Sequence, residues 1–409
     1  MTPLRILHTA DWHLGKRLDH ISRLPEQHQV LDEMVELAER EEVDIILVAG
    51  DLFDHANPSI EAIELLYKTL KRLSSNGHRL VVGIAGNHDA PDRIQAPDPL
   101  ARDNGILLLG YPESVLRSGE LPGGWAIRHS VPGYAEITSP RHPFPFRLLA
   151  TPYANALRLK KFLPPDDEGA ELRELLATHW QNLAATYLDE AGANVLMTHL
   201  FFMRKGEAKE EESDDERSIL TVGGAQEVFT ENLPAQLQYA ALGHLHRAHF
   251  VQEGPFPVAY SGSILSYSMS EAGQQKSCYV VEVAPGKEAQ VKKIPLSRGK
   301  TLHRKKFDGV SAAVEWLQQH PDTLVELTLN LPTYLSAKER KLLYEAHDGI
   351  VTIIPFVQQD EDGAPANTRQ VDLSQDIEVL FQGYFQQKYQ QAPHEEVMKL
   401  FQEILSEPD

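Results

Sequence analysis

Cysteine is almost missing from this sequence of 409 residues, which contains Cys278 and no other. A single thiol cannot form an intramolecular disulfide, so the chain cannot be a disulfide-stapled secreted scaffold, and a multi-cysteine zinc or iron–sulfur site is excluded as well. We read Cys278 as a strand residue rather than as a nucleophile. The composition therefore indicates a reducing compartment and a chemistry that uses other side chains.

Long apolar runs are also missing, and no segment approaches the roughly 20 residues needed to span a bilayer. The first apolar segment begins almost at once, without the charged leader and apolar core of a signal peptide. We therefore expect a cytoplasmic protein with no membrane segment. With 42% hydrophobic residues, the chain can bury a large core and is expected to contain more than one domain.

Positive charge is scarce, because 39 Lys and Arg residues stand against 59 Asp and Glu residues, a formal net charge of −20. A chain that holds nucleic acid by itself normally carries a basic surface. Part of the excess lies in the acidic segment 205–216, which has the composition of a solvated loop. Two basic clusters, 158–161 and 298–306, are either solvated faces or contacts to a phosphate backbone. If the chain acts on nucleic acid, the charge suggests that part of the affinity comes from a partner.

What the sequence does contain is five short polar motifs, each at the end of a run rich in Val, Ile and Leu. The motifs are Asp11-Trp12-His13, Gly50-Asp51-Leu52-Phe53-Asp54, Gly86-Asn87-His88-Asp89, Thr198-His199-Leu200 and Gly243-His244-Leu245-His246. The apolar runs predict strands covered on both faces, at 4–10, 44–50, 79–86, 194–198 and 238–243. Loops at the carboxyl ends of such strands gather in one crevice, so the motifs can form one site. Gly50, Gly86 and Gly243 permit close approach there, because they lack Cβ.

The donor types indicate the kind of metal. The set combines carboxylate and amide oxygens with imidazoles and no thiolate: Asp11, Asp51, Asn87, His13, His199, His244 and His246. Such donors suit Mn²⁺, Fe²⁺ or Zn²⁺. They are too many for one tetrahedral ion but suit two ions that share a carboxylate, an arrangement that hydrolyses phosphoesters. His199 is the weakest member taken singly, and Gly86–Asp89 alone has the composition of a tight turn; the set as a whole carries the prediction.

These motifs resemble those of the calcineurin-like metallophosphoesterase superfamily. The wording around them, such as Leu7-His8-Thr9-Ala10 before Asp11 and Tyr260-Ser261-Gly262-Ser263 further on, is similar to the Mre11-like SbcD family of bacterial nuclease subunits. The resemblance implies an α/β fold: a four-layer α/β/β/α sandwich at 1–296 with a small α/β capping domain at 297–358. It also implies a linker at 359–372 and C-terminal helices at 373–409.

The resemblance assigns roles to the motif residues. It implies that one ion is bound by Asp11, His13 and His246, that the other is bound by Asn87, His199 and His244, and that Asp51 bridges both. The expected ions are two Mn²⁺. His88 is expected to be catalytic, contacting the scissile phosphate and protonating the leaving oxygen, with Asp54 as its carboxylate partner. Mre11 proteins carry a histidine where Asp54 stands, so this position resembles the phosphatase branch.

The resemblance also implies a function. It predicts a Mn²⁺-dependent DNA nuclease subunit, acting as a double-strand exonuclease and as a single-strand and hairpin endonuclease. Such a subunit works in an SbcCD-type ATP-dependent complex for DNA repair, recombination and replication, as a homodimer within a heterotetramer. The alternative is a metallophosphoesterase acting on a small-molecule or protein phosphoester. A metal-free scaffold is a third reading, against which the complete donor set argues.

Downstream of the motifs the apolar spacing changes. It predicts strand, helix, strand, helix and strand at 302–307, 309–320, 323–329, 336–346 and 350–356. Two amphipathic helices are then predicted at 373–389 and 394–405. These two helices have no core of their own, so they must bury their apolar faces on something. Either they pack back on the cap or, as the resemblance implies, they bind an SbcC/Rad50-like ATPase subunit.

Overall fold

The structure, a computed structural model, describes residues 2–160, 168–207 and 227–357, with the short stretches 380–382, 385, 393, 397–398 and 401 beyond them. The chain divides into two compact units, of which one comprises Met1–Leu331 with Leu335–Phe356 and the other Pro332–Tyr334 with Val357–Asp409. The predicted helices at 373–389 and 394–405 lie largely outside the described residues, although 380–382, 385, 397–398 and 401 are helical. Among the described residues no helix has the length and apolar character to cross a membrane.

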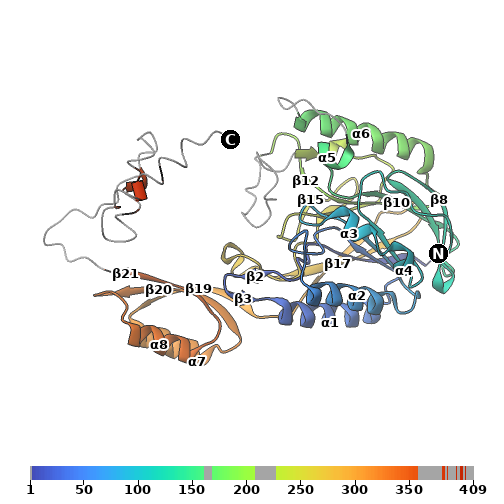
Figure 1. Cartoon of the computed structure of the whole chain (residues 1–409). Coiled ribbons are helices and arrows are strands. Elements are labelled where there is room, and N and C mark those ends of the chain that lie inside the picture. Colours follow the sequence, from blue (N-terminus) through green and yellow to red (C-terminus); the bar gives the residue numbers. More distant parts are fainter. Residues whose placement is uncertain are drawn as a thin grey trace. The chain divides into compact units, whose positions relative to one another are not determined.

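Two sheets form the centre of the first unit (Figure 1). The first contains, in spatial order, β18 (Gln290–Pro295), β17 (Ser277–Val283), β1 (Leu4–Thr9), β4 (Ile45–Val48), β5 (Leu80–Ile84) and β6 (Ile106–Leu109). The second contains β15 (His249–Gln252), β16 (Val258–Tyr260), β14 (Tyr239–Gly243), β11 (Ala193–His199), β10 (Pro145–Thr151), β9 (Tyr134–Thr138), β8 (Ala126–Val131) and β7 (Gly119–Glu120). The five strands predicted from the apolar runs are β1, β4, β5, β11 and β14, and all five are present.

Alternating side chains along each strand build the layers. In β1, Ile6 points into the core between the two sheets, whereas Leu7 points to the opposite face. The opposite face is covered by α1 (Leu24–Arg40) and α2 (Ile60–Ser74), through Leu31 of α1 among others. The far face of the second sheet packs on α6 (Glu168–Tyr187). Successive side chains of a strand point to opposite faces, so each sheet packs on the other sheet with one face and on helices with the other face. This gives the four layers of the predicted α/β/β/α sandwich.

Short elements connect and flank the layers. The helices are α3 (Pro91–Gln95), α4 (Asp98–Arg102) and α5 (Ala156–Leu159), with 3₁₀ turns η1 (Pro122–Gly124), η2 (Thr230–Asn232) and η3 (Met269–Glu271). Two small ribbons pair β2 (Arg17–Leu18) with β3 (Ile21–Ser22) and β12 (Phe201–Met203) with β13 (Glu227–Phe229). Of these, α5 contacts the loop after β5, and η3 contacts the loop after β14.

The segment after β18 folds as the predicted strand–helix alternation. It contains β19 (Thr301–Asp308), α7 (Val310–Gln319), β20 (Thr323–Leu331), α8 (Ala337–Ala346) and β21 (Ile350–Val357). Leu327 and Leu329 of β20 face the helices in a small core of their own. On the other face of the sheet, Leu302 and Leu324 pack in a separate cluster. We call this segment the cap; its boundaries as a domain, 297–358, and the linker at 359–372 stay predictions.

The core between the sheets gives a direct test of this layering. Leu148 of β10 is fully buried there, whereas Leu100 of α4 is 76% exposed. We expect Leu148→Ala to lower the free energy of unfolding by about 2–5 kcal/mol, because the truncation leaves a cavity that rigid sheets cannot fill. The matched change Leu100→Ala should stay within about 0.5 kcal/mol. Urea unfolding of both variants measures this, and equal losses would contradict the layer assignment.

Candidate metal centre

The carboxyl ends of strands from both sheets meet at one place. The Asp11 loop follows β1 and the Asp51 loop follows β4; the backbone N–H of Asp11 donates to Gly50 O at 3.0 Å and that of His13 to Asp51 O at 2.9 Å. His199 is the last residue of β11, and His244 follows β14 in the second sheet. The N–H of His244 donates to Asp11 Oδ1 at 3.0 Å, which joins the two sheets. All seven predicted donors lie here, and none is more than 7% exposed.

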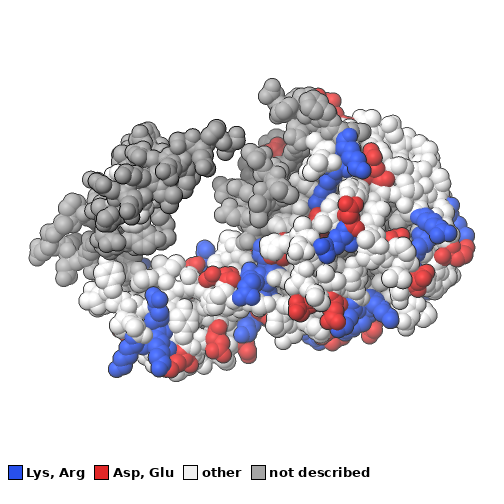
Figure 2. All heavy atoms as spheres, in the orientation of Figure 1, with Lys and Arg blue, Asp and Glu red and all other residues white. Residues whose placement is uncertain are grey.

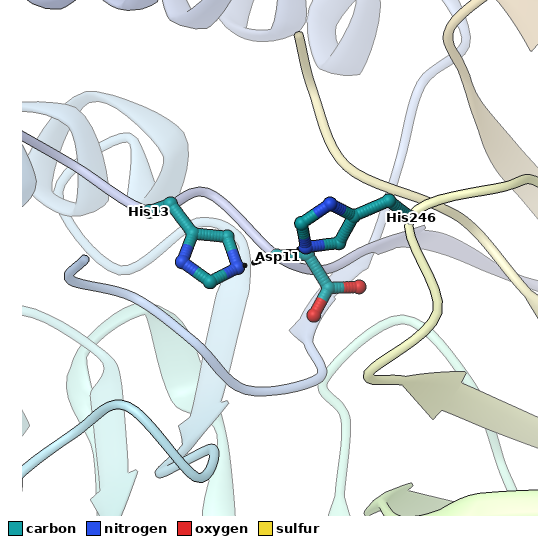
Figure 3. A group of neighbouring side chains, drawn as sticks. All are labelled: Asp11, His13 and His246. Carbon is teal, nitrogen blue, oxygen red and sulfur yellow. Dashed lines mark hydrogen bonds between the residues drawn. The ribbon is translucent and has the colours of Figure 1, made fainter. Parts of the chain in front are cut away.

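Asp11, His13 and His246 form the first group of donors (Figure 3). The two Nε2 atoms of His13 and His246 lie 3.0 Å apart, each turned toward the other. Two imidazole lone pairs repel at this distance unless a proton or a cation lies between them. Two nitrogens bound at right angles to one ion, each about 2.1 Å from it, would be about 3 Å apart. The first group therefore fits a metal ion.

Asn87, His199 and His244 form the second group. The Oδ1 atom of Asn87 lies 2.8 Å from His199 Nε2 and 3.2 Å from His244 Nδ1. The other nitrogen of His199, Nδ1, lies 2.8 Å from the carbonyl of Ala49 and must donate to it, because a carbonyl only accepts. His199 Nε2 thus presents its lone pair to an amide oxygen. This group too needs a cation or an added proton.

Asp51 lies between the two groups. Its Oδ2 atom is 3.5 Å from His13 Nε2 in the first group and 3.3 Å from His199 Nε2 in the second. Its Oδ1 atom accepts the backbone N–H of His88 at 2.9 Å. One carboxylate oxygen that faces both groups is compatible with a bridging ligand, the role that the resemblance implies for Asp51.

Strained backbone and glycines, which have no Cβ atom, allow the predicted donors to lie this close together. Asp11, His13 and Asp51 have φ of 52°, 43° and 48°. Non-glycine residues rarely adopt such angles, which cost about 1–3 kcal/mol each and concentrate at functional sites. A Cβ on Gly86 would lie 2.1 Å from Asp51 Oδ1, and one on Gly50 would lie 2.2 Å from His199 Nδ1. The glycines before the ligands are therefore required by close approach, as the sequence indicated.

The titration of the buried groups shows how the charge is balanced. Burial raises the pKa of Asp11 to about 7 and lowers the pKa of His13 to about 3. Burial opposes the ionisation of Asp51, yet the adjacent His199 imidazole holds the pKa of Asp51 well below its usual range. Burial likewise opposes protonation of His199, yet the Asp51 carboxylate raises the pKa of His199 to about 9. Each shift favours the charged form of one partner because the other is charged, and a divalent cation bound here would compensate the carboxylates in the same way.

His88 lies beside the shared carboxylate but outside both groups. Its Nδ1 atom is 3.1 Å from the backbone oxygen of Asp54 and must donate to it. Its Nε2 atom is buried without a hydrogen-bond partner among the described residues. Because Nδ1 is the donor, the neutral ring carries its lone pair on Nε2.

The structure places Asp54 differently from the expectation that its carboxylate partners His88. Oδ1 of Asp54 forms an ion pair with Lys16 at 3.0 Å and lies 3.7 Å from His13 Nδ1. Burial opposes the charge, but His13 and Lys16 lower the pKa of Asp54 to about 2. The carboxylate thus faces His13, and only the main chain of Asp54 reaches His88. The main chain before Asp54 runs beside the first loop, because Leu14 and Phe53 form a bridge and the N–H of Asp54 donates to Leu14 O at 3.3 Å.

The chain is similar to several known proteins. Residues 4–201 match the model of the calcineurin-like phosphoesterase family. The D subunit of nuclease SbcCD from Bacillus subtilis strain 168 is 36% identical over 98% of this chain and 98% of its own length. The protein of the same name from Rhodobacter capsulatus is 35% identical over 77% of this chain and 74% of its own. The solved structure of TT1561 of Thermus thermophilus covers 71% of this chain and 99% of its own, at 14% identity and a TM-score of 0.38.

The chain belongs to the SbcD family. This confirms the predicted family, the metallophosphoesterase fold and the class of enzyme, a metal-dependent hydrolase that serves as a nuclease subunit. The buried Asp and His cluster of this SbcD-family chain is its divalent metal site.

Two supporting residues, Gln27 and Glu271, were not found from the sequence, because each acts from an element that is distant in sequence. Gln27 of α1 donates its Nε2–H to the carbonyl of His13 at 2.8 Å and to Tyr267 Oη at 2.9 Å. Glu271 of η3 places Oε1 3.3 Å from His246 Nδ1. Asp89, inside the Gly86–Asp89 motif itself, is a further supporting residue: it accepts the backbone N–H groups of Leu52, Phe53 and Gly86 and so ties two ligand loops together.

Arg158 belongs to the first basic cluster, 158–161. From the sequence, this cluster is either a solvated face or a contact to a phosphate backbone. In this SbcD-family structure the Arg158 side chain is directed into the protein. Its guanidinium donates to the carbonyls of Gly86 and Asp89, both at 2.8 Å, and lies over the ring of Tyr153. Asn155 begins α5 by accepting the N–H of Arg158, which sets the direction of the side chain. Arg158 therefore holds the Asn87 loop in place.

Loss of a donor should be visible as loss of metal. Losing a residue that only hydrogen-bonds a metal ligand weakens metal binding roughly 10–100-fold. We expect His246→Ala to weaken binding of one ion by more than this, because it removes a direct donor. Equilibrium dialysis with elemental analysis measures the bound metal. His28→Ala is the matched control, because His28 lies on α1 with a side chain 60% exposed. Equal metal content in the two variants would remove His246 from the site.

Proposed function

We propose that this SbcD-family chain is the nuclease subunit of an SbcCD-type complex and hydrolyses DNA backbone phosphodiesters with two Mn²⁺ ions. The observation that carries the proposal is the pair of donor groups that share Asp51, beside a histidine whose Nε2 lacks a described partner. Mixed oxygen and imidazole donors without thiolate suit Mn²⁺. Likeness to proteins named as the D subunit of nuclease SbcCD supports DNA as the substrate.

The chain's own residues define the division of labour. Asp11, His13 and His246 would hold one ion, Asn87, His199 and His244 the other, and Asp51 both. Bound ions supply positive charge for the phosphate oxygens and activate a water molecule. His88 Nε2 then carries a proton to the departing oxygen, since Nδ1 is committed to the carbonyl of Asp54. The proposed role of Asp54 is to orient His13 rather than to tune the acid.

The proposed organisation assigns each part of the chain a task. Residues 1–296 form the nuclease domain, 297–358 the capping domain, 359–372 a linker, and 373–409 the segment that binds an SbcC/Rad50-like ATPase. Within the second unit, the rings of Phe381 and Phe401 stack 4.0 Å apart, which supports a helical pair with an aromatic seam. The exposed Ile60 and Leu100 support a second proposed contact, pairing of two copies in a heterotetramer.

The nuclease proposal is tested with purified protein, Mn²⁺ and duplex DNA, with and without the ATPase partner. We expect His88→Leu to keep its metal and to cleave about 10²–10⁴-fold more slowly, the range that loss of a general acid causes. Asn87→Ala should lose cleavage and one ion together. If the wild type turns over a phosphomonoester but no DNA, the alternative of a small-molecule or protein phosphoesterase replaces the nuclease.

The partner proposal has its own test. Phe381→Asp should weaken association with the ATPase at least about tenfold, because a charge would be buried in an apolar interface. The dissociation constant is measured by adding increasing concentrations of each variant to ATPase that is immobilised on a surface. Tyr334→Asp is the control, since Tyr334 is 83% exposed and lies on the loop before α8. Equal affinity of both variants would place the partner elsewhere.

A further inference from the structure

Glu271 is a buried carboxylate, 3% exposed, that is no donor of either group. Its Oε1 atom lies 3.3 Å from His246 Nδ1 and accepts the backbone N–H groups of Tyr267 and Ser268, both at 3.2 Å. Its Oε2 atom forms an ion pair with Lys276. Lys276 in turn donates to the carbonyl of His246 at 2.9 Å and to Ser263 Oγ at 3.0 Å. Glu271 and Lys276 thus hold His246 by its ring and by its main chain.

This arrangement decides which ring nitrogen of His246 carries the proton. A carboxylate only accepts, so Nδ1 of His246 carries the proton and donates it to Glu271. Nε2 is then left with its lone pair, and Nε2 is the atom that faces His13 Nε2 at 3.0 Å (Figure 3). A carboxylate behind a metal-bound imidazole fixes the tautomer, orients the ring and raises its basicity. The position of Glu271 therefore bears on the first group of donors and not on the second.

The segment that carries Glu271 also touches the cap. Glu271 ends η3, and Ser268 begins that turn by accepting the N–H of Ser270. Met269 and Ala272, on either side, pack against the apolar cluster formed by Leu18, Leu302, Leu324 and Val351. Three of these four residues belong to the strands of the cap. A stretch of a few residues therefore contacts a predicted metal ligand at one point and the cap sheet at another.

We propose that Glu271 is a positioning residue for His246, and that η3 makes the affinity of the first metal position depend on the packing of the cap sheet. The inference rests on the proposed two-metal function of the site. It assigns the cap a part in forming the metal site, in addition to any part in handling substrate. The closeness of Glu271 to His246 and the contact of Met269 with the cap cluster are independent observations.

Titration of the full chain with Mn²⁺, followed by the electron paramagnetic resonance signal of the free ion, tests the first step. Glu271→Gln keeps the size of the side chain but removes the charge, and we expect one of two binding steps to weaken about 10–100-fold. Glu271→Asp, which keeps the charge, should recover part of that loss. The control is Asp44→Asn, since Asp44 is equally buried, pairs with Arg141 and lies at the start of β4, away from the donors.

A pair of cap variants tests the second step. Leu302→Ala removes packing from the cluster that η3 contacts, whereas Leu327→Ala removes equivalent packing from the helix-facing core of the same small sheet. We expect Leu302→Ala to weaken the same Mn²⁺ step that Glu271→Gln weakens, by a factor of about three to ten, and Leu327→Ala to leave both steps unchanged. Urea unfolding confirms that both variants fold, so that a common loss of stability does not explain the difference.

The outcomes separate this inference from the proposed nuclease function. If Glu271→Gln binds Mn²⁺ as the wild type does, Glu271 is structural only and the inference fails, whatever the nuclease assay gives. If both cap variants weaken binding equally, the link through η3 fails. If the wild type binds two Mn²⁺ with the predicted variant effects but cleaves no DNA, the inference stands and the nuclease proposal fails.

Discussion

The burial of two carboxylates at the junction of two sheets is the constraint on which the site depends. Asp11 and Asp51 have essentially no contact with solvent, and a buried charge is stable only with compensation nearby. Four imidazoles and an amide supply donors around them, and divalent ions supply the missing positive charge. The backbone has positive φ at Asp11, His13 and Asp51, and neighbouring atoms approach closely at Gly50 and Gly86. This strain persists because the surrounding structure holds the donors close together at the centre.

That centre explains the architecture around it. Donors come from loops at the ends of β1, β4, β5, β11 and β14, so the site exists only if the two sheets keep one relative position. The core between the sheets fixes that position with residues such as Ile6 and Leu148. Hydrogen bonds between loops, from His244 to Asp11 and from Asp11 to Gly50, then set the spacing of the donors. Rigid strands with short strained loops give the precision that a metal site requires.

The predicted donors have local signals in the sequence: an apolar strand of the right length ends in a polar residue, in several cases directly after a glycine. The strands that carry Asp11, Asp51 and Asn87 are present close to the predicted bounds, and so is the strand–helix alternation of the cap. Gln27, Arg158 and Glu271 have no such signal, since their roles arise from tertiary neighbours far away in sequence. Asp54 shows the same limit: the resemblance implies a partner for His88, whereas the carboxylate lies beside His13 and Lys16 of the loop after β1.

The same tertiary contacts bear on how an acidic chain can act on DNA. Arg158 is turned inward to loop carbonyls, Arg298 pairs with Glu36, and Arg304 pairs with Glu326. Basic and acidic side chains are interspersed on the face in Figure 2, so no single basic surface stands out among the described residues there. With a net charge of −20, the phosphate backbone gains little attraction from the chain as a whole. In the proposed function, the bound ions would attract one phosphate group at the centre, and the proposed partner subunit would supply the remaining affinity along the duplex.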